Sequence, residues 1–228
     1  MNETKLFMPF EVPPLGGGGG CIFITGIGTE IGKTLVSAVV AEALQADYWK
    51  PIQAGLDDGS DNEKVKTLIS NQSIILYPEL YKFKMPVSPH IAAREENKRI
   101  DLEEIATRLK EIPSSRLVIE GAGGLMAPLN ETHFIIDLIE LLQAKVILVS
   151  RNYLGSINHS LLTAALCKQK QLNVAGWIFN DQYLQYEDEI VGWSGYPKIG
   201  SIPFGQEVTP GFVKTQAEII KENLMKYL

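Results

Sequence analysis

A chain of 228 residues with a net charge of −6 and 45% hydrophobic residues has the size and composition of one α/β domain with a substantial buried core. It contains no block of lysines and arginines, which argues against a nucleic-acid or anionic-membrane partner, since both kinds of binding need a basic surface. No apolar run approaches the roughly 18 residues of a membrane helix, and residues 1–15 lack the apolar segment of a signal peptide. We therefore expect a cytoplasmic protein, in which Cys21 and Cys167 are reduced thiols in apolar surroundings.

Residues 1–20 form a segment of unusual composition. Pro13 and Pro14 are followed by five glycines, Gly16 to Gly20, and such a sequence cannot pack a core. The sequence therefore predicts a flexible N-terminal tail over residues 1–20 and a single domain over residues 21–228.

From Cys21 onward, short apolar runs alternate with segments of helical periodicity. The predicted strands are 21–25, 47–50, 116–120, 145–150, 174–179 and, more weakly, 198–202. The predicted helices are 33–45, 61–70, 101–111, 134–142, 158–170 and 214–227. Strands that are apolar throughout are covered on both faces, so the pattern predicts a doubly wound, mostly parallel sheet with helices on both faces. Ligands bind at the carboxyl ends of strands in such sheets.

The first predicted strand ends in a glycine-rich turn, Gly26-Ile27-Gly28-Thr29-Glu30-Ile31-Gly32-Lys33-Thr34, which leads directly into a helix. Backbone N–H groups of such a turn surround phosphate oxygens, and the helix N-terminus adds a positive dipole. Lys33 is then expected to reach the β- and γ-phosphates, and the Thr34 hydroxyl to bind Mg²⁺. The first glycine lies one residue further from Gly32 than in the common motif, and the alternative is a surface turn with a solvated lysine.

Charged residues follow the next two strands. Lys50, held extended by Pro51, is expected either to face Lys33 across a phosphate pocket or to be an exposed strand-end lysine. Asp61 is expected either to cap the following helix or to bind Mg²⁺, with Ser60 as the other capping candidate. Glu120 ends an apolar strand, where a carboxylate is costly unless it is paired or bound to metal, and this favours a second Mg²⁺ ligand.

Asn180 ends a later apolar strand. Its amide offers both a donor and an acceptor, which suits the edge of a purine base, although an Asx turn at a strand end is an equal alternative.

Together these segments resemble the dethiobiotin synthetase family. The likeness runs in order from about residue 21 to about residue 205. It rests on the turn 26–34 and on the segments 50–55, 60–61, 88–93, 120–124, 155–159, 175–177, 180–181 and 200–203. No single segment is diagnostic, but the ordered set is specific.

The resemblance implies an ATP- and Mg²⁺-dependent cyclo-ligase that joins CO₂ to the two amines of 7,8-diaminononanoate. It implies catalytic roles for Lys33 and Lys50, Mg²⁺ ligands at Thr34, Asp61 and Glu120, and a homodimer. The implied ATP-binding residues are Glu30, Ile31, Gly32, Lys33, Thr34, Leu35, Asp61, Glu120, Gly121, Ala122, Gly123, Asn180, Asp181, Pro203, Phe204 and Gly205. The implied substrate-binding residues are Ala54, Asn158 and Tyr186, with Asn158 acting across the dimer interface.

Two positions depart from many family members, which have Asp at Gly28 and a Ser or Thr hydroxyl at Ala54. An alternative on the same fold is a nucleotide-switch ATPase of the partitioning or septum-site type. Such proteins place a second lysine near the start of the phosphate loop, where this chain has Ile27 and Gly28. A third alternative, an amidating synthetase of the cobyrinic-acid type, normally carries a glutaminase region with a nucleophilic cysteine, and no such segment follows here.

Overall fold

The computed structural model describes residues 20–181, 184–205 and 207–228. Apart from Gly20, the predicted tail 1–20 lies outside the described residues. The main sheet is formed by β1 (Cys21–Gly26), β2 (Asp47–Trp49), β4 (Leu76–Tyr77), β6 (Leu117–Glu120), β7 (Lys145–Arg151), β8 (Val174–Asn180) and β9 (Lys198–Ile202). Its order is β4-β2-β6-β1-β7-β8-β9, and each strand runs parallel to its neighbours.

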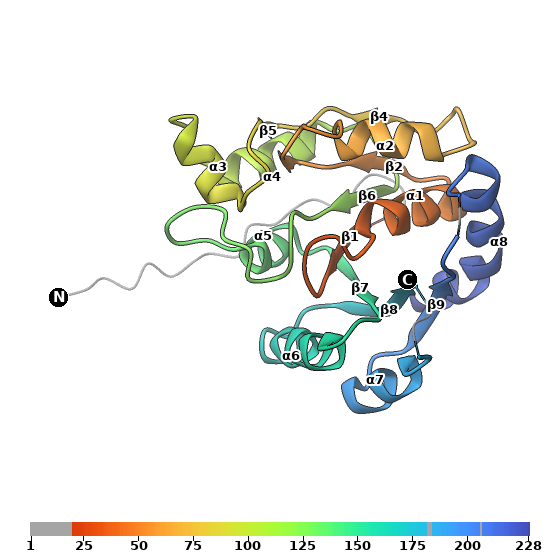
Figure 1. Cartoon of the computed structure of the whole chain (residues 1–228). Helices are drawn as coiled ribbons and strands as arrows, with labels where there is room; N and C mark the ends of the chain where they lie inside the picture. Colours follow the sequence, from red (N-terminus) through yellow and green to blue (C-terminus); the bar gives the residue numbers. More distant parts are fainter. Residues whose placement is uncertain (1–19, 182–183, 206) are drawn as a thin grey trace.

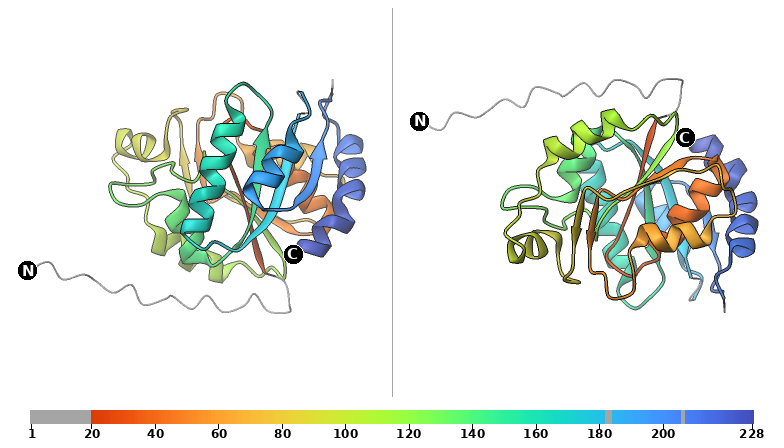
Figure 2. Two further views of the ribbon diagram at one scale, coloured as in Figure 1. Left: turned by 90° about the horizontal axis from the view of Figure 1, so that it is seen from below. Right: turned by 90° about the horizontal axis from the view of Figure 1, so that it is seen from above.

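Two further strands, β3 (Ile52–Ala54) and β5 (Tyr81–Phe83), pair in a small parallel sheet of their own. The helices are α1 (Lys33–Leu44), α2 (Asp61–Leu68), α3 (Pro89–Glu95), α4 (Leu102–Glu111), α5 (Ile135–Leu142), α6 (Ser156–Gln169), α7 (Glu187–Ser194) and α8 (Pro210–Tyr227). One face of the main sheet packs against α1, α2 and α8, and the other against α4, α5, α6 and α7 (Figures 1 and 2). The predicted doubly wound fold is confirmed.

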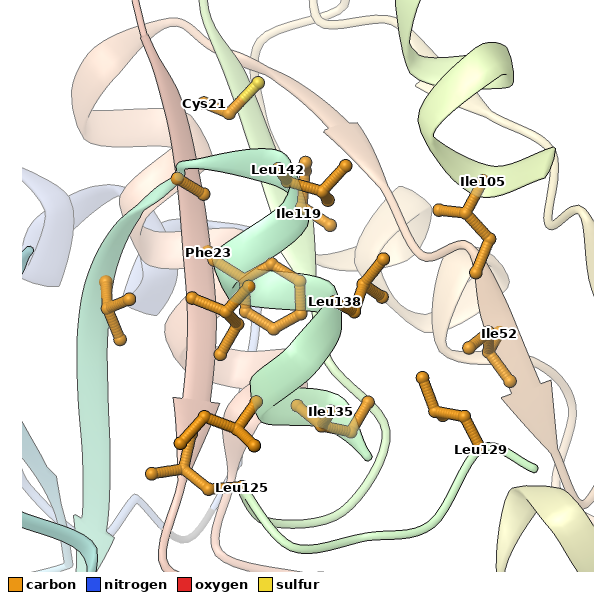
Figure 3. Close-up of a cluster of buried hydrophobic side chains, with 14 of the residues drawn as sticks. Cys21, Phe23, Ile52, Ile105, Ile119, Leu125, Leu129, Ile135, Leu138 and Leu142 are labelled. Carbon is orange, nitrogen blue, oxygen red and sulfur yellow. The ribbon is translucent and has the colours of Figure 1, made fainter. Parts of the chain in front are cut away.

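The central strand β1 supplies side chains to both faces of the sheet. Ile22 and Ile24 lie in the cluster under α1 and α8, whereas Phe23 belongs to the cluster under α4 and α5. Figure 3 shows Phe23 in one cluster with Ile119 of β6 and Leu138 of α5. Full burial of each such side chain contributes about 1.5–3 kcal/mol, so a strand covered on both faces is apolar along its whole length.

The short and irregular elements were missed by the sequence analysis, which did not predict β3, β4, β5, α3 or α7. The missed strands have two or three residues each, too few to establish a periodicity. The start predicted for the last helix, residue 214, was wrong: Pro210 occupies its first turn, and the Thr209 hydroxyl caps it by accepting from the Phe212 N–H at 3.2 Å. The helix predicted at 158–170 begins at Ser156.

None of the helices in the described residues is long and apolar enough to cross a membrane. Cys21 and Cys167 are free thiols buried in the core, and burial raises their pKa values to about 11 and about 12.

Candidate active site

The carboxyl ends of β1, β6 and β2 meet at one edge of the sheet. In the parallel register Ile24 lies opposite Glu120, and Trp49 lies opposite Ile119. The next residue along β2 is Lys50, so the sheet itself places Lys50 beside Glu120 and both of them beside the phosphate loop. The sequence analysis expected Lys50 and Glu120 to lie next to the phosphate loop, and the structure places them there.

The last turn of the phosphate loop contains a close contact that only glycine permits. Gly32 has φ +86°, and a Cβ on it would lie 1.9 Å from Nδ2 of Asn180. That amide donates to the carbonyl of Ile31 at 3.1 Å and fixes the last turn of the loop. No side chain caps the N-terminus of α1, so its first N–H groups are free for an anion. Lys33 donates to the carbonyl of Gly28 at 2.5 Å and spans the loop.

A buried cluster of charges lies next to the loop. Nζ of Lys50 is 3.0 Å from Oε1 of Glu120 and also forms an ion pair with Asp61. The Thr34 hydroxyl donates to the same Oε1 at 3.0 Å. Lys50 is 5% exposed and Glu120 1%, so Lys50 is not the exposed strand-end lysine that the sequence allowed.

The position of Asp61 is set by the start of α2. Ser60 caps this helix in a reciprocal pair with Glu63, whose N–H donates to the Ser60 hydroxyl at 3.3 Å. The N–H of Asp61 donates to the amide oxygen of Gln53 at 3.1 Å. The capping role therefore belongs to Ser60, and the carboxylate of Asp61 is available to face Lys50.

These contacts change the acidity of the groups involved. Burial opposes the charged form of Lys50, but Glu120 and Asp61 outweigh it, and the pKa of Lys50 is raised. Burial also opposes ionisation of Asp61, yet the charge and hydrogen bond of Lys50 hold the pKa of that carboxyl below its ordinary value. Burial lowers the pKa of Lys33 to about 8, and repulsion from Lys50 acts in the same direction. Lys50 is therefore firmly cationic at neutral pH, and Lys33 is the more easily deprotonated lysine.

The donor set suits Mg²⁺ bound together with a nucleotide. Within the described ranges, no group of three or more His, Cys, Asp and Glu side chains could hold a metal ion. Thr34, Asp61 and Glu120 instead offer one hydroxyl and two carboxylates, and the carboxylates already share one cation, the ammonium of Lys50. Mg²⁺ is typically bound by one or two carboxylates together with substrate phosphates and water, so these residues fit the ion.

A cleft of about 1490 Å³ opens over this cluster. It is lined by Lys33, Lys50, Ala54 and, among the predicted nucleotide contacts, by Glu30, Gly32, Thr34, Asp61, Glu120, Ala122 and Gly123. Its apolar wall includes Leu125 and Met126 after β6 and Leu162 and Leu166 on α6. One cavity therefore combines a glycine-rich loop, two lysines and an apolar surface.

Comparison with known proteins identifies the family. A family model described as an AAA domain matches residues 21–211. The chain is 44% identical to the ATP-dependent dethiobiotin synthetase of Cytophaga hutchinsonii over 88% of this chain and 97% of that protein. It is 45% identical to the enzyme of the same name from Christiangramia forsetii, over 89% and 96% of the two chains. The chain belongs to the dethiobiotin synthetase family.

Solved structures show how widely the fold of this dethiobiotin synthetase family member is shared. The cell division ATPase MinD of Pyrococcus furiosus superposes with a TM-score of 0.60 at 14% identity, over 92% of this chain and all of that one. A ParA family ATPase of Chlorobium tepidum gives 0.58 at 13% identity, over 91% and 98%. At such identities the likeness establishes the fold alone, and sequence similarity separates the ligase from the switch ATPases.

The residues predicted to border the base lie on the β8 side of the phosphate loop and do not line the cleft. Asn180 contacts the loop, and the N–H of Asp181 donates to the carbonyl of Ile202 at the end of β9, at 3.0 Å. This bond brings residues 203–205 beside Asp181, with Phe204 74% exposed. Arg151 joins this group by bonding Asp181 and the carbonyl of Glu30, both at 3.4 Å. The remaining predicted contacts, Ile31, Leu35 and Gly121, also lie outside the cleft lining.

The predicted substrate residues separate into two places. Ala54 lines the cleft, whereas Asn158 is exposed in the first turn of α6 and does not line it. The Tyr186 hydroxyl lies at the same helix start, 2.6 Å from the Ser156 hydroxyl and 3.1 Å from the carbonyl of Tyr153. Asn158 and Tyr186 are thus near the start of α6 and not beside the lysines of this dethiobiotin synthetase family member.

Sequence analysis missed several polar residues of the site. His159 lines the cleft, and Gln53 both lines it and holds the backbone of Asp61. Tyr48 is fully buried, and its hydroxyl donates to Oε2 of Glu120 at 2.8 Å. Burial and the charge of Glu120 raise the pKa of Tyr48 well above its usual value. Strand alternation held a signal for Tyr48, since residues two apart share a face and Lys50 was already a candidate.

Proposed function

We propose that this chain is an ATP-dependent dethiobiotin synthetase, which converts 7,8-diaminononanoate, CO₂ and ATP into dethiobiotin, ADP and phosphate. The observation that carries the proposal is the cleft in which Lys33, Lys50 and the phosphate loop lie together beside an apolar wall. Family membership at 44–45% identity over nearly the whole relative supports the same activity.

The reaction needs positive charge where oxygen atoms become more negative. One amine of the substrate adds to CO₂ and gives a carbamate, whose oxygen attacks the γ-phosphorus and displaces ADP. The second amine then attacks the carbonyl carbon of this mixed anhydride, phosphate leaves, and the ring closes. Lys33 and Lys50 supply cations at the carbamate and at the transferred phosphoryl group, and such preorganised charges stabilise the transition state more than the ground state.

We assign the phosphate cradle to residues 30–35, the Mg²⁺ ligands to Thr34, Asp61 and Glu120, and the adenine border to Asn180, Asp181 and residues 203–205. The N–H groups at the start of α1 bind phosphate oxygens, and the bond from Asn180 to Ile31 keeps the loop in shape for this. Bound Mg²⁺ would supply charge neutralisation on the triphosphate oxygens.

We further propose a homodimer in which Asn158 and Tyr186 of one subunit contact the substrate tail held by the other. Asn158 is exposed and outside its own cleft. Leu154, just before α6, is 99% exposed, and Leu162 on α6, which also lines the cleft, is 62% exposed. A second copy covering this surface would bury both leucines. Sedimentation velocity should show a dimer that Leu154→Glu dissociates, whereas Ile219→Glu, which places the same charge at an exposed position of α8, leaves it intact. A monomeric parent chain would contradict the dimer.

The buried thiols Cys21 and Cys167 carry no disulfide between them, which suits the reducing cytoplasm that we propose for the enzyme.

The deciding experiment measures ADP release with Mg²⁺, ATP and bicarbonate, with and without 7,8-diaminononanoate, and identifies the product by mass. We expect diamine-dependent ADP release, a product with the mass of dethiobiotin, and loss of both in EDTA. ADP release that ignores the diamine would reject the ligase and favour the nucleotide-switch alternative on the same fold.

A further inference from the structure

The Tyr48 side chain lies beneath the proposed metal ligands without lining the cleft. Tyr48 and Lys50 are two residues apart in the β2 segment, so both side chains point to the α1 face, while Trp49 points to the opposite core. Tyr48 is 0% exposed, and its hydroxyl reaches Oε2 of Glu120 at 2.8 Å. The Tyr48 hydroxyl therefore contacts the carboxylate of Glu120 from the side away from the cleft.

The two oxygens of Glu120 have separate partners. Oε1 accepts from the Thr34 hydroxyl and from the Lys50 ammonium, both at 3.0 Å. Oε2 accepts from Tyr48, which is the partner that the structure gives this atom. Glu120 is 1% exposed, so no bulk water replaces that donor if it is lost. The Tyr48 hydroxyl therefore holds the oxygen opposite the one bonded to Thr34 and Lys50, and together these three donors set the rotation of the carboxylate plane.

We propose that Tyr48 is a positioning residue of the active site, whose hydroxyl holds the Glu120 carboxylate in the orientation that receives Mg²⁺ with the nucleotide. The inference rests on the proposed function, from which it takes the metal-binding role of Glu120. Groups that orient metal ligands in this way typically alter metal affinity 10–100-fold when they are removed, although they never touch the ion.

The test is Tyr48→Phe, which keeps the ring in the core and deletes only the hydroxyl. Binding of a non-hydrolysable ATP analogue is titrated by calorimetry, once in EDTA and once over a range of Mg²⁺ concentrations. We expect the Mg²⁺ concentration for half-maximal enhancement of binding to rise about tenfold. Binding in EDTA should change less than about twofold, because the phosphate loop is untouched.

Tyr81→Phe is the matched control. Tyr81 is also buried, and its hydroxyl also bonds a carboxylate, that of Glu104, but neither residue lines the cleft. Both variants lose one phenol-to-carboxylate bond, which is buried at Tyr48 and partly buried at Tyr81, whose partner Glu104 is exposed, so each should lower the melting temperature. Only Tyr48→Phe should shift the Mg²⁺ dependence.

An unchanged Mg²⁺ dependence in folded Tyr48→Phe overturns the proposal, and so does an equal shift in Tyr81→Phe. Should Tyr48→Phe fail to fold, Tyr48→Met also fills the space without a donor and carries the same expectation. Because the readout is nucleotide binding, it is independent of product formation. A chain that makes no dethiobiotin but shows the Mg²⁺ shift would reject the proposed function and keep the role of Tyr48.

Discussion

The polar groups at the ends of β1, β2 and β6 are buried or partly buried and bonded to one another, whereas Asn158, the proposed substrate contact at the start of α6, is exposed. In the first region Thr34, Lys50, Asp61 and Glu120 form one connected network, closed underneath by Tyr48. In the second region Asn158 projects from the surface beside the fully exposed Leu154. Both regions follow parallel strands of the same sheet, so the difference comes from what packs around them.

In the proposed function, one chain builds the nucleotide half of the site by itself, and a second copy completes the half at α6. A buried charge is tolerated only when it is paired, so the first network has to be complete within the folded chain. An exposed amide carries no such requirement. Changes in the buried network should therefore affect chemistry, nucleotide binding and stability together, while changes at α6 should affect one ligand alone.

Lys50→Ala should have the largest effect and would break the buried network at its centre. Dethiobiotin formation should fall about a thousandfold, because a cation at the reacting group is lost. Unfolding should become easier by about 3–5 kcal/mol, since Asp61 and Glu120 then face each other without a counter-charge. Product assays and urea unfolding measure the two effects.

The control for this change is Lys170→Ala, which removes the lysine of an exposed pair, whose Nζ lies 3.0 Å from Glu140 and outside the cleft lining. Exposed pairs contribute little, so activity and stability should remain near those of the parent chain. Normal turnover in Lys50→Ala would exclude this lysine from the mechanism.

Gly32→Ala tests the shape of the phosphate loop. The added Cβ would lie 1.9 Å from Nδ2 of Asn180 at a backbone position of φ +86°, so the loop has to distort. ATP affinity should fall about a hundredfold or more, as measured by calorimetry. Gly28→Ala is the control, because a Cβ there meets nothing within 4 Å; similar losses in both variants would show that the loop is merely sensitive to any side chain.

Asn158→Ala tests the difference between the two regions, because it changes only the exposed region at the start of α6. We expect the KM for the diamine to rise about tenfold, as for the loss of one hydrogen bond to a charged group, while the KM for ATP stays constant. Steady-state kinetics in both substrates give the answer, with Gln169→Ala at the other end of α6 as the control. A change in the KM for ATP would argue that the two regions are not separate.

The smallest effect is expected for Thr209→Ala. Thr209 lies at the start of α8 and does not line the cleft. Its hydroxyl caps α8, and losing a cap costs about 1 kcal/mol of stability without a change in activity. Urea unfolding should resolve the difference, and Thr215→Ala on the same helix should not reproduce it. Reduced activity at full folding would show that α8 influences the site.

Much of the fold could be predicted from local sequence patterns. All of the predicted strands and helices exist, since runs such as 146–149 are apolar throughout and mark strands buried on both faces. The failures concern short elements and one helix start. β3 and β5 are three residues long, and the first turn of α8 contains a proline that the sequence analysis placed before the helix. The short strands depend on partners that a window of sequence does not contain, whereas the start of α8 has a local signal, Thr209 before Pro210, that the sequence analysis did not use.

The candidate site likewise contains some features that local sequence predicts and others that only the tertiary structure sets. The turn ending in Gly32-Lys33-Thr34 is a local motif, so the sequence by itself determined the glycine-rich turn between β1 and α1, as well as the apolar strands that place Glu120 at the sheet edge. Only the tertiary structure decided that Ser60 takes the cap and leaves Asp61 to Lys50, and that Asn180 holds the loop. It also decided that Tyr48 supports Glu120 from below and that Asn158 stays outside the cleft. The physical reason is that each of these outcomes depends on which donor meets which acceptor across distant segments, and strand register and packing set that pairing.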